Sequence, residues 1–189
     1  MSSANAGQVA YWNGPIGQVW AREQEKRDRD HAPITEAAIV LAAPKAGEAV
    51  LDIGCGSGTT TLMLAERAGP NGLALGIDLS RPMLDVARRR AAAANSIAQF
   101  VEADATDFPF EQGRFDLAFS QFGVMFFADP TEALANVRRA LKPAGRLIVA
   151  CWRTPDEHLW SSIPEDAAKP HLPPAAPVNY NAQIGRAHV

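Results

Sequence analysis

Residues 49–58 read Ala-Val-Leu-Asp-Ile-Gly-Cys-Gly-Ser-Gly, a short apolar run with an acid that leads into a glycine at every second position. The apolar part, residues 49–53, is typical of a strand buried on both faces of a parallel sheet. Gly54, Gly56 and Gly58 lack a Cβ and can adopt positive φ angles, so a ligand can lie directly on the backbone there. A helix is predicted to follow, and its first N–H groups can face an anionic group of that ligand.

The spacing of these glycines separates two classes of nucleotide site. A dinucleotide fingerprint, G-x-G-x-x-G, would need a third glycine where this sequence has Thr59. The acid-x-G-x-G-x-G pattern found here resembles that of the class I S-adenosylmethionine-dependent methyltransferases. Glycines that serve only a tight strand-to-helix turn are the alternative. The resemblance implies that the cofactor is S-adenosyl-L-methionine and that the turn binds it through Asp52, Gly54, Cys55, Gly56 and Gly58.

A second acid ends the next predicted strand, residues 73–78. Asp78 would lie beside the ligand crevice, where it can accept hydrogen bonds from both ribose hydroxyls. Its alternative role is to cap the following helix, but we expect Ser80 to be that cap. Leu79 and Met83 resemble the family positions that sandwich the adenine ring, although either residue alone is more often part of a core.

A third acid, Asp104, ends the predicted strand within residues 98–105. Its carboxylate can accept a hydrogen bond from the exocyclic amine of adenine, and the Ala105 N–H can serve a ring nitrogen. Three segments therefore match the family pattern in order.

The segment after the fourth predicted strand, residues 120–127, bears on the methyl acceptor. Methyltransferases that act on base amines resemble one another in an (Asn/Asp)-Pro-Pro-aromatic motif here, and the cytosine-carbon class has a nucleophilic Cys after Pro. Residues 120–123 read Ser-Gln-Phe-Gly and contain neither motif. The segment resembles the small-molecule, quinone-biosynthesis branch instead, which implies that Ser120 and the residues after it wall the methionine end of the cofactor and the substrate cavity. Ordinary core packing of residues 124–127 is the alternative.

Strands and helices alternate through a fifth predicted strand, residues 146–152. This order predicts an α/β fold: a doubly wound, Rossmann-like parallel sheet with helices on both faces and the glycine turn at the switch point. We expect residues 48–160 to be the cofactor-binding core and residues 1–47 to be an N-terminal helical lid. Trp12 and Trp20 could dock this lid on the sheet, cover the cofactor, or do both.

Residues 161–189 are Pro-rich and predicted to be irregular, resembling the start of an insertion. The last two strands of the family fold are missing, so we expect a C-terminally truncated fragment whose fifth strand has an unpaired, aggregation-prone edge. Within the lid, Pro33 is predicted to begin a second helix, 34–43, after a first one over 21–30. Arg88, Arg89 and Arg90 are predicted to be the solvated end of a helix.

Composition is ordinary for a single globular domain: 189 residues, 47% hydrophobic, 21% charged, with a net charge of −3. This charge gives no basic field for nucleic acid, so we expect none as a partner. No stretch resembles a signal peptide or a membrane span, which favours a cytoplasmic location. The two cysteines, Cys55 and Cys151, have no metal-ligand spacing, and no metal site is predicted.

These observations predict methyl transfer to a small-molecule acceptor by in-line displacement, in which holding the acceptor close matters more than a strong catalytic group. We assign no catalytic residue; His31 and His158 are candidates by type only. The sequence does not name the acceptor, the acceptor atom (O, C or N) or the oligomeric state. The alternatives are an inactive or binding-only fragment and a nicotinamide-dependent oxidoreductase.

Overall fold

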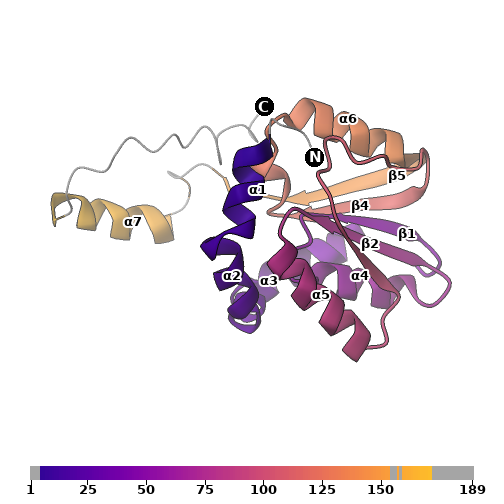
Figure 1. Ribbon diagram of the computed structural model, residues 1–189, viewed down its shortest axis with the longest axis horizontal. Coiled ribbons are helices and arrows are strands. Elements are labelled where there is room, and N and C mark those ends of the chain that lie inside the picture. Colours follow the sequence, from indigo (N-terminus) through magenta and orange to yellow (C-terminus); the bar gives the residue numbers. More distant parts are fainter. Residues whose placement is uncertain (1–4, 154–156, 158, 172–189) are drawn as a thin grey trace.

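The computed structural model describes residues 5–153, 157 and 159–171. Its centre is a parallel sheet in the order β3-β2-β1-β4-β5, so the glycine-motif strand is the middle one (Figure 1). The predicted doubly wound, Rossmann-like α/β fold is confirmed. The strands are β1 (Ala49–Ile53), β2 (Leu73–Asp78), β3 (Ala98–Glu102), β4 (Phe115–Gln121) and β5 (Leu141–Ala150), and the helices are α1 (Ala6–Asn13), α2 (Pro15–Arg22), α3 (Gln24–Ala42), α4 (Thr59–Ala68), α5 (Arg81–Ala93), η2 (Val124–Phe126), α6 (Pro130–Ala140), α7 (Leu159–Ala168) and η4 (Lys169–His171).

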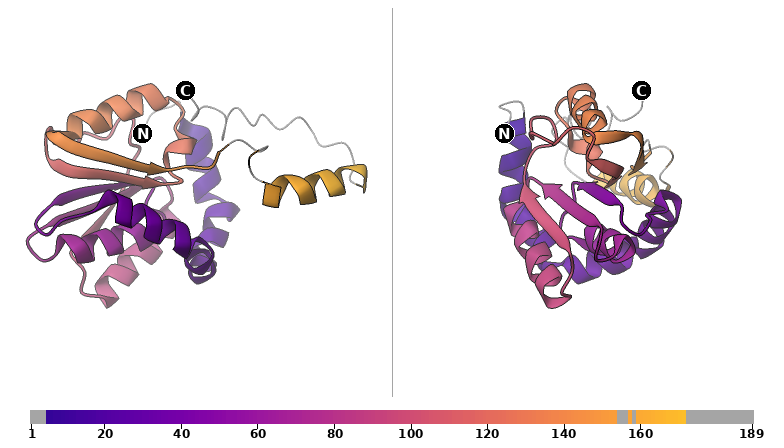
Figure 2. Two further views of the ribbon diagram at one scale, coloured as in Figure 1. Left: turned by 180° about the vertical axis from the view of Figure 1, so that it is seen from behind. Right: turned by 90° about the vertical axis from the view of Figure 1, so that its right-hand side faces the viewer.

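Apolar side chains at alternate strand positions form a core on each face of the sheet. On one face, Phe119 packs with Ile39 of α3 and Leu64 of α4. On the other, Leu51 packs with Val137 of α6. Because both faces are covered (Figure 2), the strands can be apolar throughout, as predicted for β1.

The N-terminal helices differ from the prediction at Pro33. The expected break between helices 21–30 and 34–43 is wrong, because α3 runs without interruption and contains Pro33. A proline in a helix interior costs about 3 kcal/mol. Burial of Ala38, Ile39 and Ala42 against the sheet offsets that cost. α1 and α2 lie beside the carboxyl ends of the strands, where a lid would lie (Figure 1).

The fifth strand begins earlier and ends earlier than predicted. Leu141 already pairs with Phe115, and pairing resumes at Arg146 after an irregularity that contains Pro143. A proline has no N–H for the ladder, which explains why the sequence suggested a later start. β5 is the edge of the sheet in the described part of the chain, with Leu147 38% and Val149 37% exposed. The predicted aggregation at this edge stays a prediction.

The tail contains helix where irregular chain was predicted. α7 projects away from the sheet and includes Pro164 (Figure 1). Residues 172–189 lie outside the described residues, so the irregular structure predicted for them is untested. Among the helices described, none has the length and apolar character needed to cross a membrane.

Candidate functional site

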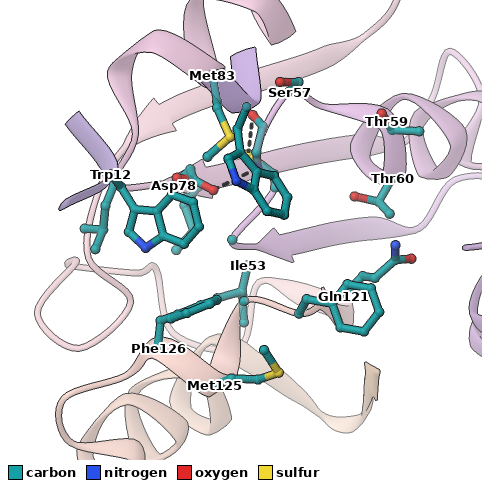
Figure 3. A pocket seen from close by; sticks show the side chains of 18 of the residues that line it. Trp12, Ile53, Ser57, Thr59, Thr60, Asp78, Met83, Gln121, Met125 and Phe126 are labelled. Atoms are coloured by element: carbon teal, nitrogen blue, oxygen red, sulfur yellow. Dashed lines mark hydrogen bonds between the residues drawn. The ribbon is translucent and has the colours of Figure 1, made fainter. Parts of the chain in front are cut away.

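A cavity of about 620 Å³ opens at the carboxyl ends of the strands. Its walls are the glycine turn after β1, the ends of β2 and β4, the turn after β3, and residues of α1, α2 and α3. Figure 3 shows Met83 and Asp78 on one side of this space and Met125 and Phe126 on the opposite side. The cavity therefore lies at the switch point, where open α/β sheets bind ligands.

The three glycines of the turn all have positive φ, but they serve different purposes. A Cβ on Gly54 would lie 2.6 Å from the Cα of Gly123, and one on Gly58 would lie 2.8 Å from a side-chain carbon of α5. A Cβ on Gly56 would meet only the sulfur of Met83, at 3.7 Å. Packing thus requires Gly54 and Gly58, whereas the open face of Gly56 belongs to the cavity. Gly58 does not line the cavity, so the direct contact predicted for it is not supported by its position.

Asp52 lies beneath the turn and does not line the cavity. Its Oδ2 accepts hydrogen bonds from the hydroxyls of Thr60 and Thr61, both at 2.6 Å. Burial raises the pKa of Asp52 to about 6, although the two hydroxyls oppose the shift. Its position supports an anchoring role for the start of α4 more than the predicted contact with the cofactor.

Asp78 lines the cavity, as predicted, and holds the backbone around it. Its Oδ2 accepts from the Gly56 N–H and its Oδ1 from the Ser80 N–H, each at 2.8 Å. Burial raises the pKa of Asp78, against the effect of these donors. Ser80 is the N-cap residue of α5, as predicted, but its side chain makes no capping bond, because its hydroxyl donates to the Trp12 carbonyl at 2.8 Å. Asp78 also holds the start of α5, because it accepts from the Ser80 N–H. This bond is part of the helix-capping role that the sequence left open for Asp78.

Asp104 and Ala105 also line the cavity, and Asp104 is only 2% exposed. The Oδ1 of Asp104 accepts from the Thr106 N–H at 2.9 Å, and its Oδ2 accepts from the Asn5 side-chain amide at 2.7 Å. Within the described chain, the Ala105 N–H meets no hydrogen-bond acceptor. The two predicted acids thus converge on one cavity, and a residue from the N-terminal segment joins them.

The remaining predicted residues divide between the cavity and the core. Cys55, Leu79 and Met83 line the cavity. Ser120 does not; its buried hydroxyl donates to the Ile53 carbonyl at 2.8 Å and links β4 to β1. The contact with the cofactor predicted for Ser120 is not supported by this position.

Aromatic side chains from the N-terminal helices both dock the lid and border the cavity. The Trp12 ring makes edge-to-face contacts with Trp20, at a centroid distance of 5.7 Å, and with Phe126, at 5.2 Å. The Arg27 guanidinium lies 4.4 Å from the centroid of the Trp20 ring. Trp12 and Trp20 thus pack the N-terminal helices together and against the segment after β4, and both border the cavity; that they cover a cofactor stays a prediction.

Arg90 ties the lid to the glycine turn, so its prediction as part of a solvated helix end is wrong. Its guanidinium donates to the Ser57 carbonyl at 2.7 Å, the Thr59 hydroxyl at 2.9 Å and the Asp28 carboxylate at 2.8 Å. The Thr59 hydroxyl donates to the same carboxylate at 2.6 Å. α3, α5 and the end of the turn are fixed together by these bonds.

The other end of the cavity is built from α3 and the segment after β4. The Phe122 and Trp152 rings stack with centroids 4.5 Å apart and an angle of 7°, and His31 meets Phe122 edge to face at 5.4 Å. Phe122 has a φ of 62°, a strained conformation for a bulky residue. The Nε of Arg27 and the Oε1 of Gln121 are buried without partners among the described residues. The last residue of β4, Gln121, and the segment after it line this cavity, the latter with Phe122, Gly123, Met125, Phe126 and Phe127. That this segment walls the methionine end of a cofactor and the substrate stays a prediction.

Sequence reasoning missed several cavity residues of the N-terminal segment. Asn5, Arg27, Asp28 and Thr35 carry no local motif, and they reach the cavity only because α1 to α3 fold across the ends of the strands. His158, a candidate by type, lies outside the described residues.

Comparison with known proteins identifies the family of the chain. Residues 50–145, just over half of the chain, match the family model for the methyltransferase domain. The chain is 45% identical over 112 residues to a demethylmenaquinone methyltransferase of Thermus thermophilus, which covers 59% of this chain and 50% of that protein. It is 36% identical over 123 residues to a 2-phytyl-1,4-naphtoquinone methyltransferase of Trichormus variabilis, covering 64% of this chain and 54% of that protein. The chain thus spans about half the length of these relatives.

A solved structure is similar over a longer stretch. A putative S-adenosyl-L-methionine-dependent methyltransferase of Methanococcus maripaludis has a TM-score of 0.61 and 25% identity, over 81% of this chain and 71% of that one. The fold, the glycine turn and the sequence matches agree with one another. The chain therefore belongs to the methyltransferase domain family, and it is a class I S-adenosylmethionine-dependent methyltransferase by its fold and its sequence matches.

Proposed function

We propose that the protein transfers a methyl group from S-adenosylmethionine to a small, ring-bearing acceptor. One observation carries the proposal: the open face of Gly56 and the carboxylates of Asp78 and Asp104 border a single cavity. A nucleoside needs this combination of close backbone approach and hydrogen-bond acceptors.

The residues of this end of the cavity fit the cofactor. Each oxygen of Asp78 accepts one backbone N–H and keeps a lone pair, so the carboxylate can still accept from two ribose hydroxyls. The Ala105 N–H and the Asp104 carboxylate offer a donor beside an acceptor, which complements an edge of adenine. Leu79 and Met83 supply apolar surface for the ring faces.

S-adenosylmethionine, when bound, supplies an activated methyl group on a sulfonium. The chain's own residues then need to hold and desolvate the acceptor. The Phe122–Trp152 stack offers a flat apolar wall against which such an acceptor can pack. Burial and the neighbouring Arg27 charge lower the pKa of His31, so its imidazole is neutral at pH 7 and able to accept a proton from an acceptor hydroxyl.

The acceptor class rests on two supports. Relatives are named for demethylmenaquinone and for a phytyl naphthoquinone, both of which contain a flat ring system. The stacked Phe122 and Trp152 rings suit such a shape, and the unpartnered Arg27 Nε and Gln121 Oε1 suit ring oxygens or hydroxyls. We therefore favour a quinol or phenol over an aliphatic amine.

We also propose a cytoplasmic location and no nucleic-acid partner. Cys55 and Cys151 are unpaired, as is usual where thiols stay reduced. A net charge of −3 offers little attraction to a polyanion.

Calorimetric titration with S-adenosylhomocysteine tests the cofactor, and Gly56→Ala with Gly47→Ala gives a matched pair. Both glycines have positive φ, and a Cβ on Gly47 would meet nothing within 4 Å, so both variants carry a similar backbone strain. We expect Gly56→Ala to weaken binding at least about tenfold, because its methyl enters the cavity, and Gly47→Ala to bind like the parent. Equal loss in both variants, or no binding by the parent, would remove the proposal.

A radiolabelled-methyl assay over quinol, phenol, sterol and amine acceptors tests the transfer step. Labelled product from a quinol or phenol supports the proposed acceptor. Cofactor binding without labelled product from any acceptor would favour the binding-only alternative, and binding of a nicotinamide dinucleotide would favour an oxidoreductase.

A further inference from the structure

Among the described residues that line the cavity and have a side-chain atom without a hydrogen-bond partner, Asn5 is the most buried. Five side-chain atoms in the described chain are buried without a hydrogen bond: Asn5 Oδ1, Arg27 Nε, Asp52 Oδ1, Thr106 Oγ1 and Gln121 Oε1. Of their residues, only Asn5, Arg27 and Gln121 line the cavity. Asn5 is 2% exposed, whereas the other two are partly exposed. A buried oxygen without a donor costs about 1–3 kcal/mol, so it invites a ligand that can donate.

The orientation of the Asn5 amide follows from its neighbour. A carboxylate has no proton to donate, so the amide must turn its Nδ2 toward Asp104, where the two atoms lie 2.7 Å apart. Its Oδ1 is then left to face another group. The side chain has no second task, because Asn5 precedes α1 without making a side-chain capping bond.

The two acceptors beside each other match an exocyclic amine. Such an amine carries two N–H donors, and here one can meet the carboxylate of Asp104 while the other meets Asn5 Oδ1. A carbonyl oxygen in the same place would face these two acceptor oxygens, and only the second N–H of the Asn5 amide, beside the one given to Asp104, could donate to it. The pair therefore discriminates a 6-amino purine from a 6-oxo purine.

We infer that Asn5 is a specificity residue of the cofactor site: its side-chain oxygen accepts the second N–H of the adenine amine, alongside Asp104. This inference rests on the proposed function and extends it to the N-terminal segment. It gives the N-cap residue of α1 a chemical role in base recognition.

Calorimetry with S-adenosylhomocysteine and its 6-oxo analogue, S-inosylhomocysteine, tests the inference on the full chain. We expect the parent to prefer the adenosyl ligand. Asn5→Ala and Asn5→Leu should each reduce that preference by about threefold to tenfold, the size of one hydrogen bond. Leucine fills the space of the amide, so a result shared by both variants cannot come from a new cavity.

Asn13→Ala is the control for lid docking. The Asn13 amide donates to the Leu79 carbonyl at 2.8 Å and its oxygen accepts from the Arg81 N–H at 3.0 Å, so its loss loosens α1 away from the base. This variant should weaken both ligands equally and leave the preference unchanged.

Each outcome separates the inference from the proposed function. If the parent binds neither ligand, the cofactor assignment fails. If the parent binds the adenosyl ligand and the Asn5 variants keep the full preference, Asn5 only holds the N-terminal segment against Asp104, and the inference is wrong. A preference that rises in these variants would mean that Asn5 competes with adenine for Asp104, which also overturns it. Circular dichroism and melting curves confirm that the variants fold.

Discussion

The carboxylates at the two ends of the parallel strands have different kinds of partner. We call the end at which the strands begin the amino edge and the end at which they finish the carboxyl edge. At the amino edge, Glu48 accepts from the Arg146 guanidinium at 2.8 and 2.9 Å, and Asp116 accepts from Lys142 at 2.7 and 2.8 Å. At the carboxyl edge, Asp52, Asp78 and Asp104 accept from neutral N–H and O–H donors.

The direction in which the pKa of each carboxyl group shifts depends on whether its partner is a cation or a neutral donor. The Arg146 hydrogen bonds lower the pKa of Glu48. Burial would raise the pKa of Asp116, but the bond from Lys142 and its other partners outweigh it and lower that pKa. Burial raises the pKa of Asp52 and Asp78, because no cation opposes it. The amino edge thus uses its charges for stability, whereas the carboxyl edge keeps acceptors whose lone pairs are available to a ligand.

The largest expected effect is at the amino edge, in Arg146→Met. Besides Glu48, Arg146 donates to the Ala42 and Ala43 carbonyls at the end of α3, each at 2.9 Å. We expect a loss of about 2–4 kcal/mol in the free energy of unfolding, measured by urea denaturation. Arg146→Lys should lose less, since it keeps the charge without the planar fork. Weaker binding of S-adenosylhomocysteine by folded Arg146→Met would contradict the separation of the two edges.

The next effect compares one carboxylate from each edge. In Asp78→Asn the side chain keeps one acceptor oxygen, so it can accept from the Gly56 N–H or the Ser80 N–H but not from both in the present geometry. It also loses the negative charge proposed to face the ribose. We therefore expect S-adenosylhomocysteine to bind about 30- to 100-fold more weakly. Asp116→Asn should lower the melting temperature and leave the calorimetric affinity unchanged. If both variants lose affinity alike, the edges do not differ as described.

The smallest expected effect is the pH dependence contributed by Asp52. Its pKa is raised from 3.8 to about 6, so the folded state holds a proton that the unfolded chain releases. The resulting stabilisation is full below the unfolded pKa and is lost as the pH rises through 6, with a decrease of about 1.4 kcal/mol between pH 5 and pH 7.5. Asp52→Asn should remove this loss, so its melting temperature relative to the parent should rise over that interval. A difference that is constant with pH would refute the shift.

The sequence could predict what local patterns encode. Alternating strands and helices, the glycine spacing and the acids at strand ends gave the topology and the convergence of Asp78 and Asp104. Contacts made by the N-terminal segment could not be predicted, because Asn5 pairs with Asp104 and Asp28 pairs with Arg90, both distant in sequence. The continuous α3 was missed for a related reason: burial against the sheet overrides the local preference of Pro33.

The near-contact between Gly54 and Gly123 has a mechanical consequence. A Cβ on either residue would come within 3 Å of the other's Cα, so the two backbones touch with nothing between them. One of these backbones continues into the turn that we propose to bind the nucleoside, and the other into the segment that we propose to wall the methyl acceptor. If those proposals hold, main chain packed against main chain sets the spacing between donor and acceptor, and rearrangements of side chains at the mouth of the cavity leave it unchanged.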